Sequence, residues 1–134
     1  MPEHPNVARV RAAYDAFAKG DLEGALADLA DDCVFHFGGE GPLSGDHQGR
    51  EAITAALIGT FELTGATQSL DIKGIFADDH HAAVVLHETA SRPDGATLDL
   101  DEVHVLRLNS AGQITDLWDL PADPQAHDDF FDGK

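Results

Sequence analysis

His104 has the side chain best suited to chemistry in this chain of 134 residues. Polar and apolar residues alternate through residues 97–109, and the alternation places Glu102 and His104 on the same face as four leucines. An unpaired buried polar group costs about 1–3 kcal/mol, so each of the two needs a partner or a cavity. A core histidine bonded to a backbone carbonyl, and a glutamate that reaches solvent, are the alternative interpretations.

Asp119 stands where it could be the partner of His104. Residues 113–120 follow the turn "NSAG" and predict a strand antiparallel to residues 97–109, with residues near 104 opposite residues near 118. His104 and Asp119 then meet if both point inward. A carboxylate beside an imidazole can act as an acid/base pair, and burial is expected to raise the pKa of the carboxylate.

Two further polar side chains are candidates for catalysis. Tyr14 lies on the apolar stripe of the first predicted helix, where its hydroxyl needs a partner. His36 ends the predicted strand "CVFHF" and begins a glycine-rich loop, so it is either a polar group of a pocket or an anchor for the loop. The side chains expected to line a pocket around these groups are Phe17, Phe37, Glu102, Leu106 and Trp118.

The remaining histidines do not predict a metal site. His80 and His81 follow two aspartates in a turn and are expected to be solvated, whereas His47 and His127 stand in polar sequence surroundings. No two of the eight histidines have the HxH or HxxxH spacing of metal ligands, so we expect no metal and no other cofactor. The single Cys33 cannot form an internal disulfide and is expected to pack in the core.

The composition limits the possible partners. The chain has 25 acidic residues against 8 Lys and Arg residues, a net charge of −17, and the acids are spread along its length. Such a charge repels nucleic acid and anionic membranes. No apolar run approaches the ~20 residues of a membrane span. Because the N-terminus also lacks a secretory signal, a soluble cytoplasmic protein is expected.

Helical spacing comes first in the chain, and alternation follows it. The predicted helices are residues 4–19, a segment capped by Asp21 whose apolar stripe runs to Leu29, and residues 50–65. The predicted strands are 33–37, 67–77, 81–91, 97–109 and 113–120, and a short last helix has Asp123 as its cap and Pro124 at its first position. Helices followed by antiparallel strands predict one α+β domain over residues 1–134, with the helices on one face of a curved sheet.

Three stretches carry a resemblance to a known family. They are "GDLEGALADLADD", the "SGDHQGREAI" entry to the third helix, and the hairpin "VHVLRLNSAGQITDLWD". With them the chain resembles, over nearly its whole length, the SnoaL-like branch of the superfamily of nuclear transport factor 2 and ketosteroid isomerase. The resemblance implies a cone of three helices wrapped by a strongly bent sheet, a deep pocket open at one end, and frequently a dimer. The glycine-rich loop after His36 would then lie near the mouth of the pocket.

The resemblance implies less about the reaction, because the fold hosts isomerases, cyclases, epoxide hydrolases, dehydratases and proteins without known activity. Counted without gaps, the general base of ketosteroid isomerases falls at Phe37, their oxyanion tyrosine at Ala13 beside Tyr14, and their second oxyanion acid at His104. Steroid isomerisation by that mechanism is therefore not expected. SnoaL-type polyketide cyclases are similar in using a histidine and an aspartate on the last two strands, which match His104 and Asp119.

These observations together predict a cofactor-free enzyme of the isomerase, cyclase or lyase type. Its substrate would be a small, largely apolar carbonyl compound of polyketide or terpenoid type. Asp119 would remove or relay a proton and His104 would donate to the developing enolate oxygen, with Tyr14 and His36 assisting. The alternative is a non-catalytic module that binds an apolar ligand or serves for dimerisation. A homodimer is expected to form through the outer face of the sheet, near Val103 and Val105.

Overall fold

The computed structural model describes residues 3–41 and 43–134, and in it three helices precede most of a six-stranded sheet. In chain order the elements are α1 (Pro5–Ala18), α2 (Leu22–Ala25), β1 (Leu29–Phe37), β2 (Gly45–Gln48), α3 (Gly49–Thr64), β3 (Ser69–Ala77), β4 (His81–Ser91), β5 (Thr97–Leu108), β6 (Ile114–Pro121) and α4 (Pro124–Phe131).

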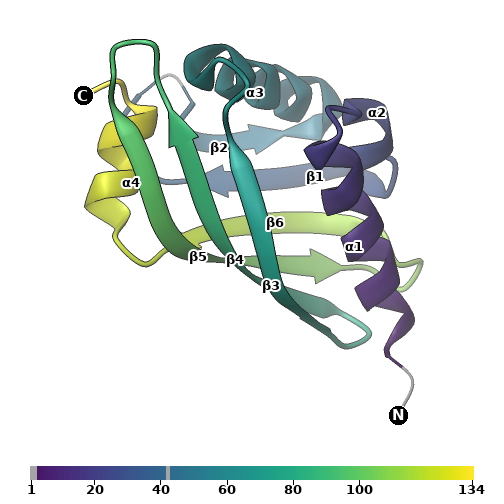
Figure 1. Ribbon diagram of the computed structural model, residues 1–134. Coiled ribbons are helices and arrows are strands. Elements are labelled where there is room, and N and C mark those ends of the chain that lie inside the picture. The colour runs from purple at the N-terminus through teal and green to yellow at the C-terminus, as the bar shows by residue number, and fades with distance from the viewer. Residues whose placement is uncertain (1–2, 42) are drawn as a thin grey trace.

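The strands lie in the order β2-β1-β6-β5-β4-β3. All neighbours run antiparallel except β1 and β6, which are parallel. Figure 1 shows the sheet bending, so that β3, β4 and β5 cross the direction of β1 and β2, with α1 at one end of the long strands and α4 at the other. The α+β class, the curved and mainly antiparallel sheet, and the short C-terminal helix are confirmed.

The helix ends follow the signals in the sequence. Asp21 accepts a hydrogen bond from the Gly24 backbone N–H at the start of α2, and Asp123 does the same for the Ala126 N–H at the start of α4. α3 ends at Gly65, whose φ of 58° lies in the left-handed region that glycine adopts without strain. These caps fix where the helices begin and end.

Two predicted boundaries were wrong. The second helix ends at Ala25 instead of continuing along an apolar stripe, and Leu29 begins β1, where it is paired with Ile114 of β6. The predicted loop after His36 contains a short strand, β2, whose residues pair with β1. The sequence of β2, "GDHQ", is polar and mostly exposed, so it shows no alternation from which a strand could be recognised.

The core lies between the helices and the inner face of the sheet. Alternate residues of β4 and β5 point inward, including Val84, Leu86 and Leu106, and pack with Val10 of α1 and Ile53 of α3. Cys33 is also buried in this core, as expected. Burial of one such side chain stabilises the fold by about 1.5–3 kcal/mol, so this layer holds the strands firmly in register.

None of the described helices is both long and apolar enough to cross a membrane.

Candidate active site

A cavity of about 120 Å³ lies between the helices and the inner face of the sheet. One part of its lining is apolar and includes Phe17, Leu26, Leu29, Phe35, Phe37, Leu57, Leu70, Leu106, Leu117 and Phe131. The other part is polar and contains Tyr14, Gln68, Glu88, Glu102, His104, Asp119 and His127. An apolar cavity with a few convergent polar groups is the usual form of a small-molecule site.

The alternation of side chains along the strands brings four of the polar groups to this cavity. Glu88 follows Val84 and Leu86 on the inward face of β4, and Glu102 and His104 take inward positions of β5. His104 is paired directly with Asp119 across the β5–β6 hairpin. The hairpin predicted from the "NSAG" turn therefore brings the two residues together, and their closest nitrogen and oxygen atoms are 3.5 Å apart.

Both ring nitrogens of His104 have partners. Nδ1 lies 2.5 Å from the hydroxyl of Tyr14, and Nε2 lies 2.8 Å from Oε1 of Glu102. Tyr14 comes from α1, so this contact ties the first helix to the middle of the sheet. The hydroxyl of Tyr14, which needed a partner on an apolar helix face, finds it in the imidazole.

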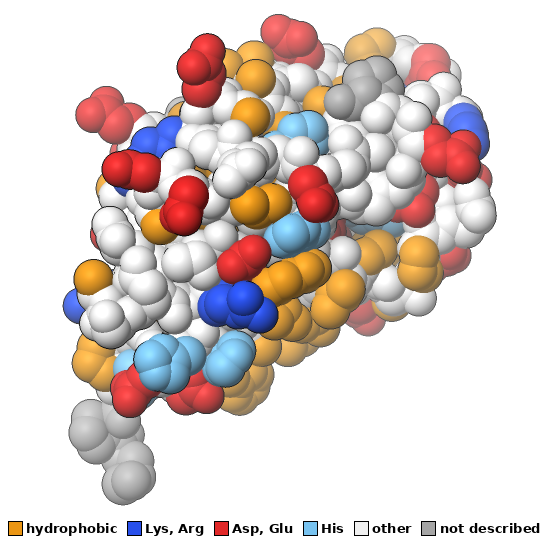
Figure 2. Space-filling view, turned by 180° about the vertical axis from the view of Figure 1, so that it is seen from behind, with side chains coloured by type: hydrophobic (Ala, Val, Ile, Leu, Met, Phe, Trp, Pro, Cys, Tyr) orange, Lys and Arg blue, Asp and Glu red, His pale blue; other side chains and the backbone are white. Residues whose placement is uncertain are grey.

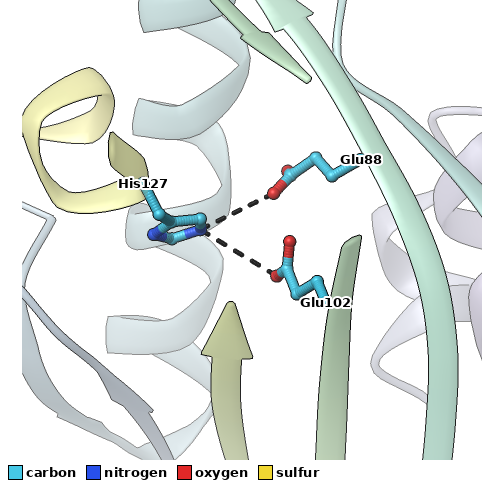
Figure 3. A group of neighbouring side chains, drawn as sticks. All are labelled: Glu88, Glu102 and His127. Carbon is cyan, nitrogen blue, oxygen red and sulfur yellow. Dashed lines mark ion pairs between the residues drawn. The ribbon is translucent and has the colours of Figure 1, made fainter. Parts of the chain in front are cut away.

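α4 contributes a second imidazole to the same cluster. Nε2 of His127 lies 3.2 Å from Asp119 Oδ2, 3.6 Å from Glu88 Oε1 and 3.9 Å from Glu102 Oε1. Figure 3 shows this ring pointing from α4 toward the two glutamates on neighbouring strands. The sequence predicted polar surroundings for His127. In the fold these surroundings are buried carboxyl groups from distant segments rather than the polar residues beside it in the chain.

The cluster controls the charge of its own carboxyl groups. Burial, together with Asp119 and Glu88 close by, raises the pKa of Glu102 to about 12, so this group is a neutral acid near neutral pH. Burial acts in the same direction on Asp119, but His104 and His127 outweigh it and hold the pKa of Asp119 well below its usual range. The sequence predicts that burial raises the pKa of Asp119. This expectation was wrong, because the two adjacent imidazoles lower that pKa by more than burial raises it.

The two imidazoles are protonated for the corresponding reason. Burial alone would lower the pKa of His104, but Tyr14 and Asp119 raise it to about 10. Burial likewise opposes the charge on His127, and Asp119 and Glu88 raise its pKa to about 10. Glu88 stays ionised, since its contacts with His127, Glu102 and Gln68 outweigh its burial and lower its pKa. Two imidazolium ions and two carboxylates then balance in charge around one neutral acid.

Several buried polar atoms of the cluster remain without a hydrogen bond among the described residues. They are Gln68 Oε1, Glu88 Oε1, Glu102 Oε2 and Asp119 Oδ1. Gln68 itself donates from Nε2 to the other oxygen of Glu88 at 2.5 Å. Buried polar groups in folded proteins almost always have partners, so these four oxygens are available to accept hydrogen bonds at the polar end of the cavity.

The structure places the remaining predicted site residues in two groups. Phe17, Phe37 and Leu106 line the cavity. His36 and Trp118 are absent from its described lining, and their rings stack on each other with centroids 4.8 Å apart. His36 also contacts Asp46 of β2 and Asp116 of β6, at 2.9 and 3.1 Å.

Strand parity explains the placement of His36 and Trp118. His36 lies between two inward-pointing phenylalanines of β1, and Trp118 lies between Leu117 and Asp119, which both reach the cavity. The two rings therefore project from the outer face of the sheet. This corrects the expectation that Trp118 lines the pocket, and it makes His36 an anchor between β1, β2 and β6.

Sequence reasoning missed Gln68, Glu88 and His127. A signal existed for Glu88, because it extends the alternating row Ala82, Val84 and Leu86 along the buried face of its strand. A weaker signal existed for His127, which shares one face of α4 with Phe130 and Phe131 at helical spacing. Nothing comparable distinguishes Gln68, which stands just before β3.

Comparisons with known proteins give a consistent family and fold. Residues 10–117 match the family model of the SnoaL-like domain. The uncharacterized protein Rv0034 of Mycobacterium tuberculosis is 25% identical over 131 residues, which cover 98% of this chain and 99% of that protein. The solved structure of Bal32a, from a soil-derived mobile gene cassette, has a TM-score of 0.86 and 29% identity, covering 94% of this chain and 95% of that one.

A more distant structure carries a ligand. Rv0760c from Mycobacterium tuberculosis was solved in complex with estradiol-17β-hemisuccinate; its TM-score is 0.73 at 23% identity, covering 87% of this chain and 93% of that one. At this level of identity the likeness concerns the fold.

Proposed function

This chain belongs to the SnoaL-like domain family, and from that premise we propose that it binds a small, largely apolar carbonyl compound and moves a proton on it. The observation that carries the proposal is the polar cluster at one end of an apolar cavity, with buried oxygens that no described residue satisfies. Such a cavity binds the hydrocarbon part of a ligand, and the cluster meets its polar atoms.

The cluster offers donors and an acceptor at the same place. The hydroxyl of Tyr14 lines the cavity and can donate to an oxygen that gains negative charge, and protonated His104, whose Nδ1 contacts that hydroxyl, can supply the proton. Donors that are already oriented in a water-poor site stabilise such an oxygen strongly. This arrangement suits enolisation, in which a carbonyl oxygen becomes an enolate.

Asp119 is suited to relaying a proton rather than removing one unaided. Its low pKa comes from two protonated imidazoles. Once His104 has given its proton to the substrate oxygen through the hydroxyl of Tyr14, one of these positive charges is gone and Asp119 becomes more basic. The pair then works in sequence, and general acid/base catalysis of this kind contributes a factor of about 10²–10⁴ in rate.

The size of the cavity limits the substrate. A cavity of about 150 Å³ is known to hold benzene, and this one has about 120 Å³. The enclosed part therefore fits one ring or a short branched chain, and a larger ligand would extend through the mouth. The complex of Rv0760c with a steroid derivative supports an apolar, ring-bearing ligand in this fold.

Asp119→Asn tests the proposed role of the pair. Wild-type protein is first screened against small cyclic ketones, enones and phenolic acids by thermal shift, and the compounds that bind are followed for turnover by mass spectrometry. Asp119→Asn keeps the shape of the carboxylate but cannot carry a proton, so it should abolish turnover while the protein stays folded. Asp116→Asn is the matched control, because Asp116 lies on the same strand but contacts His36 on the outer face.

Two results would count against the acid/base proposal. Turnover that survives in a well-folded Asp119→Asn variant would end the role of Asp119. Tight binding of a compound that no condition converts would favour the alternative, a non-catalytic ligand-binding module of the same fold.

We further propose that the protein forms a homodimer through the outer face of the sheet, which carries exposed apolar side chains. Val103 is paired across the strands with Val85 on one side and Leu120 on the other, and the last two are exposed. Figure 2 shows hydrophobic side chains gathered on the surface seen from behind. A specific dimer would bury about 1,200–2,000 Å². Light scattering that returns the monomer mass of 14.3 kDa at micromolar concentration would reject it.

The absence of nucleic-acid and membrane partners and the cytoplasmic location stay predictions from the sequence. The first two rest on the charge of −17, and Figure 2 shows acidic side chains scattered over the surface seen there rather than gathered at one site. Cell fractionation tests the location directly.

A further inference from the structure

Glu88, Glu102 and His127 form a compact group within the polar cluster (Figure 3). They come from β4, β5 and α4, and one donor atom of each lies within 4.8 Å of those of the other two. His127 Nε2 is 3.6 Å from the nearest oxygen of Glu88 and 3.9 Å from that of Glu102. Both separations are too long for hydrogen bonds. The oxygen nearest to this nitrogen is Oδ2 of Asp119, at 3.2 Å, and a bound ion would take the place of that contact.

The same separations suit atoms that flank a common ion. Nitrogen and oxygen ligands about 2.0–2.2 Å from a zinc ion lie about 3.3 Å apart at the tetrahedral angle. The observed distances are a few tenths of an ångström wider, which small side-chain rotations would close. Donor atoms from three separate elements thus already lie close enough to flank one ion.

Burial makes an empty site of this kind unfavourable. Glu88 and Glu102 are 2% and 3% exposed, and Glu88 Oε1 and Glu102 Oε2 have no hydrogen-bond partner among the described residues. The unpartnered oxygen of Glu88 is also the one that faces His127. Buried carboxylate oxygens without donors are stabilised when they coordinate a cation.

Each glutamate is also held in place by a residue outside the group. Gln68 donates to the oxygen of Glu88 that faces away from His127, and His104 Nε2 contacts Glu102 Oε1 at 2.8 Å. Hydrogen bonds of this kind orient the ligands of metal sites and leave the remaining lone pairs free. Both glutamates therefore have the supporting contacts that a metal site needs.

We propose that Glu88, Glu102 and His127 bind a divalent transition-metal ion, with zinc as the first candidate. Two carboxylates and one imidazole are a donor set for zinc and similar ions rather than for calcium or magnesium, which take oxygen ligands almost exclusively. All three residues line the cavity, so the remaining coordination positions face the space where a ligand binds. Three protein ligands with an open position are typical of catalytic rather than structural zinc sites.

The spacing of histidines along the chain gave no sign of the site, because its three ligands come from separate elements. The inference goes beyond the function proposed above and does not depend on it, since it is tested with the metal alone.

Metal binding is measured on chelator-treated wild-type protein. Titration calorimetry with Zn²⁺ should show one ion per chain with micromolar or tighter affinity, and Co²⁺ should give visible d–d absorption bands at the same stoichiometry. Glu88→Gln and His127→Gln should each weaken Zn²⁺ binding at least about 100-fold, and Gln68→Ala about 10–100-fold, as supporting residues of metal sites do. Circular dichroism establishes that each variant is folded.

His87 on the outer face provides the matched control. It lies between Asp99 and Asp101, at 2.5 and 2.7 Å, but it is only half-buried and is absent from the described lining of the cavity. His87→Gln should leave the affinity and the Co²⁺ bands unchanged. If His127→Gln fails to fold, Glu88→Gln and the wild-type Co²⁺ spectrum decide the question. Wild-type protein that binds neither ion at micromolar concentration, or binding that is lost in His87→Gln and kept in Glu88→Gln, would overturn the proposal.

Discussion

The two faces of the sheet carry the same kinds of side chain in different surroundings. On the outer face, His87 lies between Asp99 and Asp101 and remains in contact with water. On the inner face, His104 contacts Glu102 and Asp119 and all three are buried. Both arrangements place one imidazole between two carboxyl groups. His87 of β4 contacts two carboxylates of the neighbouring strand β5, whereas His104 of β5 contacts one carboxyl group of its own strand and one of β6.

The difference shows that burial, and not residue type, turns such a group into a candidate site. An exposed ion pair contributes about 0–1 kcal/mol because water and salt screen it. A buried carboxyl group loses its hydration, and for Glu102 the pKa rises to about 12. Neighbouring positions of one strand point to opposite faces. A shift of one residue along a strand therefore separates a solvated ion pair from a buried cluster that lines the cavity.

The largest expected effect is that of removing the inner imidazole. His104→Ala leaves Glu102, Asp119 and Tyr14 without their shared partner, and breaking a buried ionic contact costs about 3–5 kcal/mol. The free energy of unfolding, measured in urea, should fall by about this amount. His87→Ala should remain close to wild type, because its carboxylates keep their water. An equal fall in the free energy of unfolding of His104→Ala and His87→Ala would show that burial does not distinguish the two faces of the sheet.

A smaller effect is expected for Tyr14→Phe. This change removes only the hydroxyl that contacts His104 Nδ1 at 2.5 Å, and a hydrogen bond to a charged group such as the imidazolium contributes about 1.5–3 kcal/mol. Urea unfolding should show a loss in that range, together with weaker binding of any carbonyl ligand found in the screen. Asp46→Ala, which removes an exposed partner of His36 on the outer face, should cost less. A larger loss in Asp46→Ala than in Tyr14→Phe would contradict the assignment of the faces.

Much of this arrangement could be predicted from the sequence, because period-two alternation is a local property. The pattern through residues 97–109 placed Glu102 and His104 on the buried face, and the "NSAG" turn set the register that pairs His104 with Asp119. The strand 81–91 was predicted with the same bounds as β4. Where a turn is short, local signals fix both the strands and the residues that face each other.

The rest depends on contacts between distant segments. His127 reaches the cluster because α4 packs against the ends of β5 and β6, and no local pattern gives the direction in which a short terminal helix turns back. The pKa of Asp119 could not be foreseen for the same reason, since its second imidazole was unknown. His36 and Trp118 were misplaced because the faces of short or irregular strands have no clean alternation.

Added salt should stabilise the protein by screening the repulsion between exposed acids, and it should have little effect on the buried cluster of the inner face. The net charge of −17 is carried mostly by exposed acids, whose repulsion is screened within about 8 Å at physiological ionic strength. The Tm should rise by a few degrees between low and molar NaCl, which corresponds to about 1 kcal/mol or less. KCl should act in the same way, because screening does not distinguish the two cations. A Tm that does not change with salt, or that rises only with one cation, would contradict this expectation.

The smallest expected effect is a pH dependence that comes from the outer histidines. Burial opposes the charge on His36, but Asp116 and Asp46 outweigh it and raise its pKa, and Asp101 and Asp99 raise the pKa of His87. A histidine with a raised folded pKa stabilises the protein fully below its unfolded pKa of about 6.5 and loses that contribution as the pH rises through the folded pKa.

The Tm of the wild type should therefore fall as the pH rises from 6.5 through the raised pKa values of these histidines. It should fall more steeply than the Tm of the double variant His36→Gln/His87→Gln, and differential scanning calorimetry measures both. The difference should be small because both rings are partly exposed and Asp46, Asp99 and Asp101, which pair with them, are largely exposed. It should also shrink in molar NaCl, which screens exposed pairs but not the buried contacts of His104. Identical slopes of Tm against pH for the two proteins at low salt would show that the outer ion pairs do not stabilise the fold. A difference in slope that persists in high salt would mean that the outer pairs are shielded from solvent like the inner cluster.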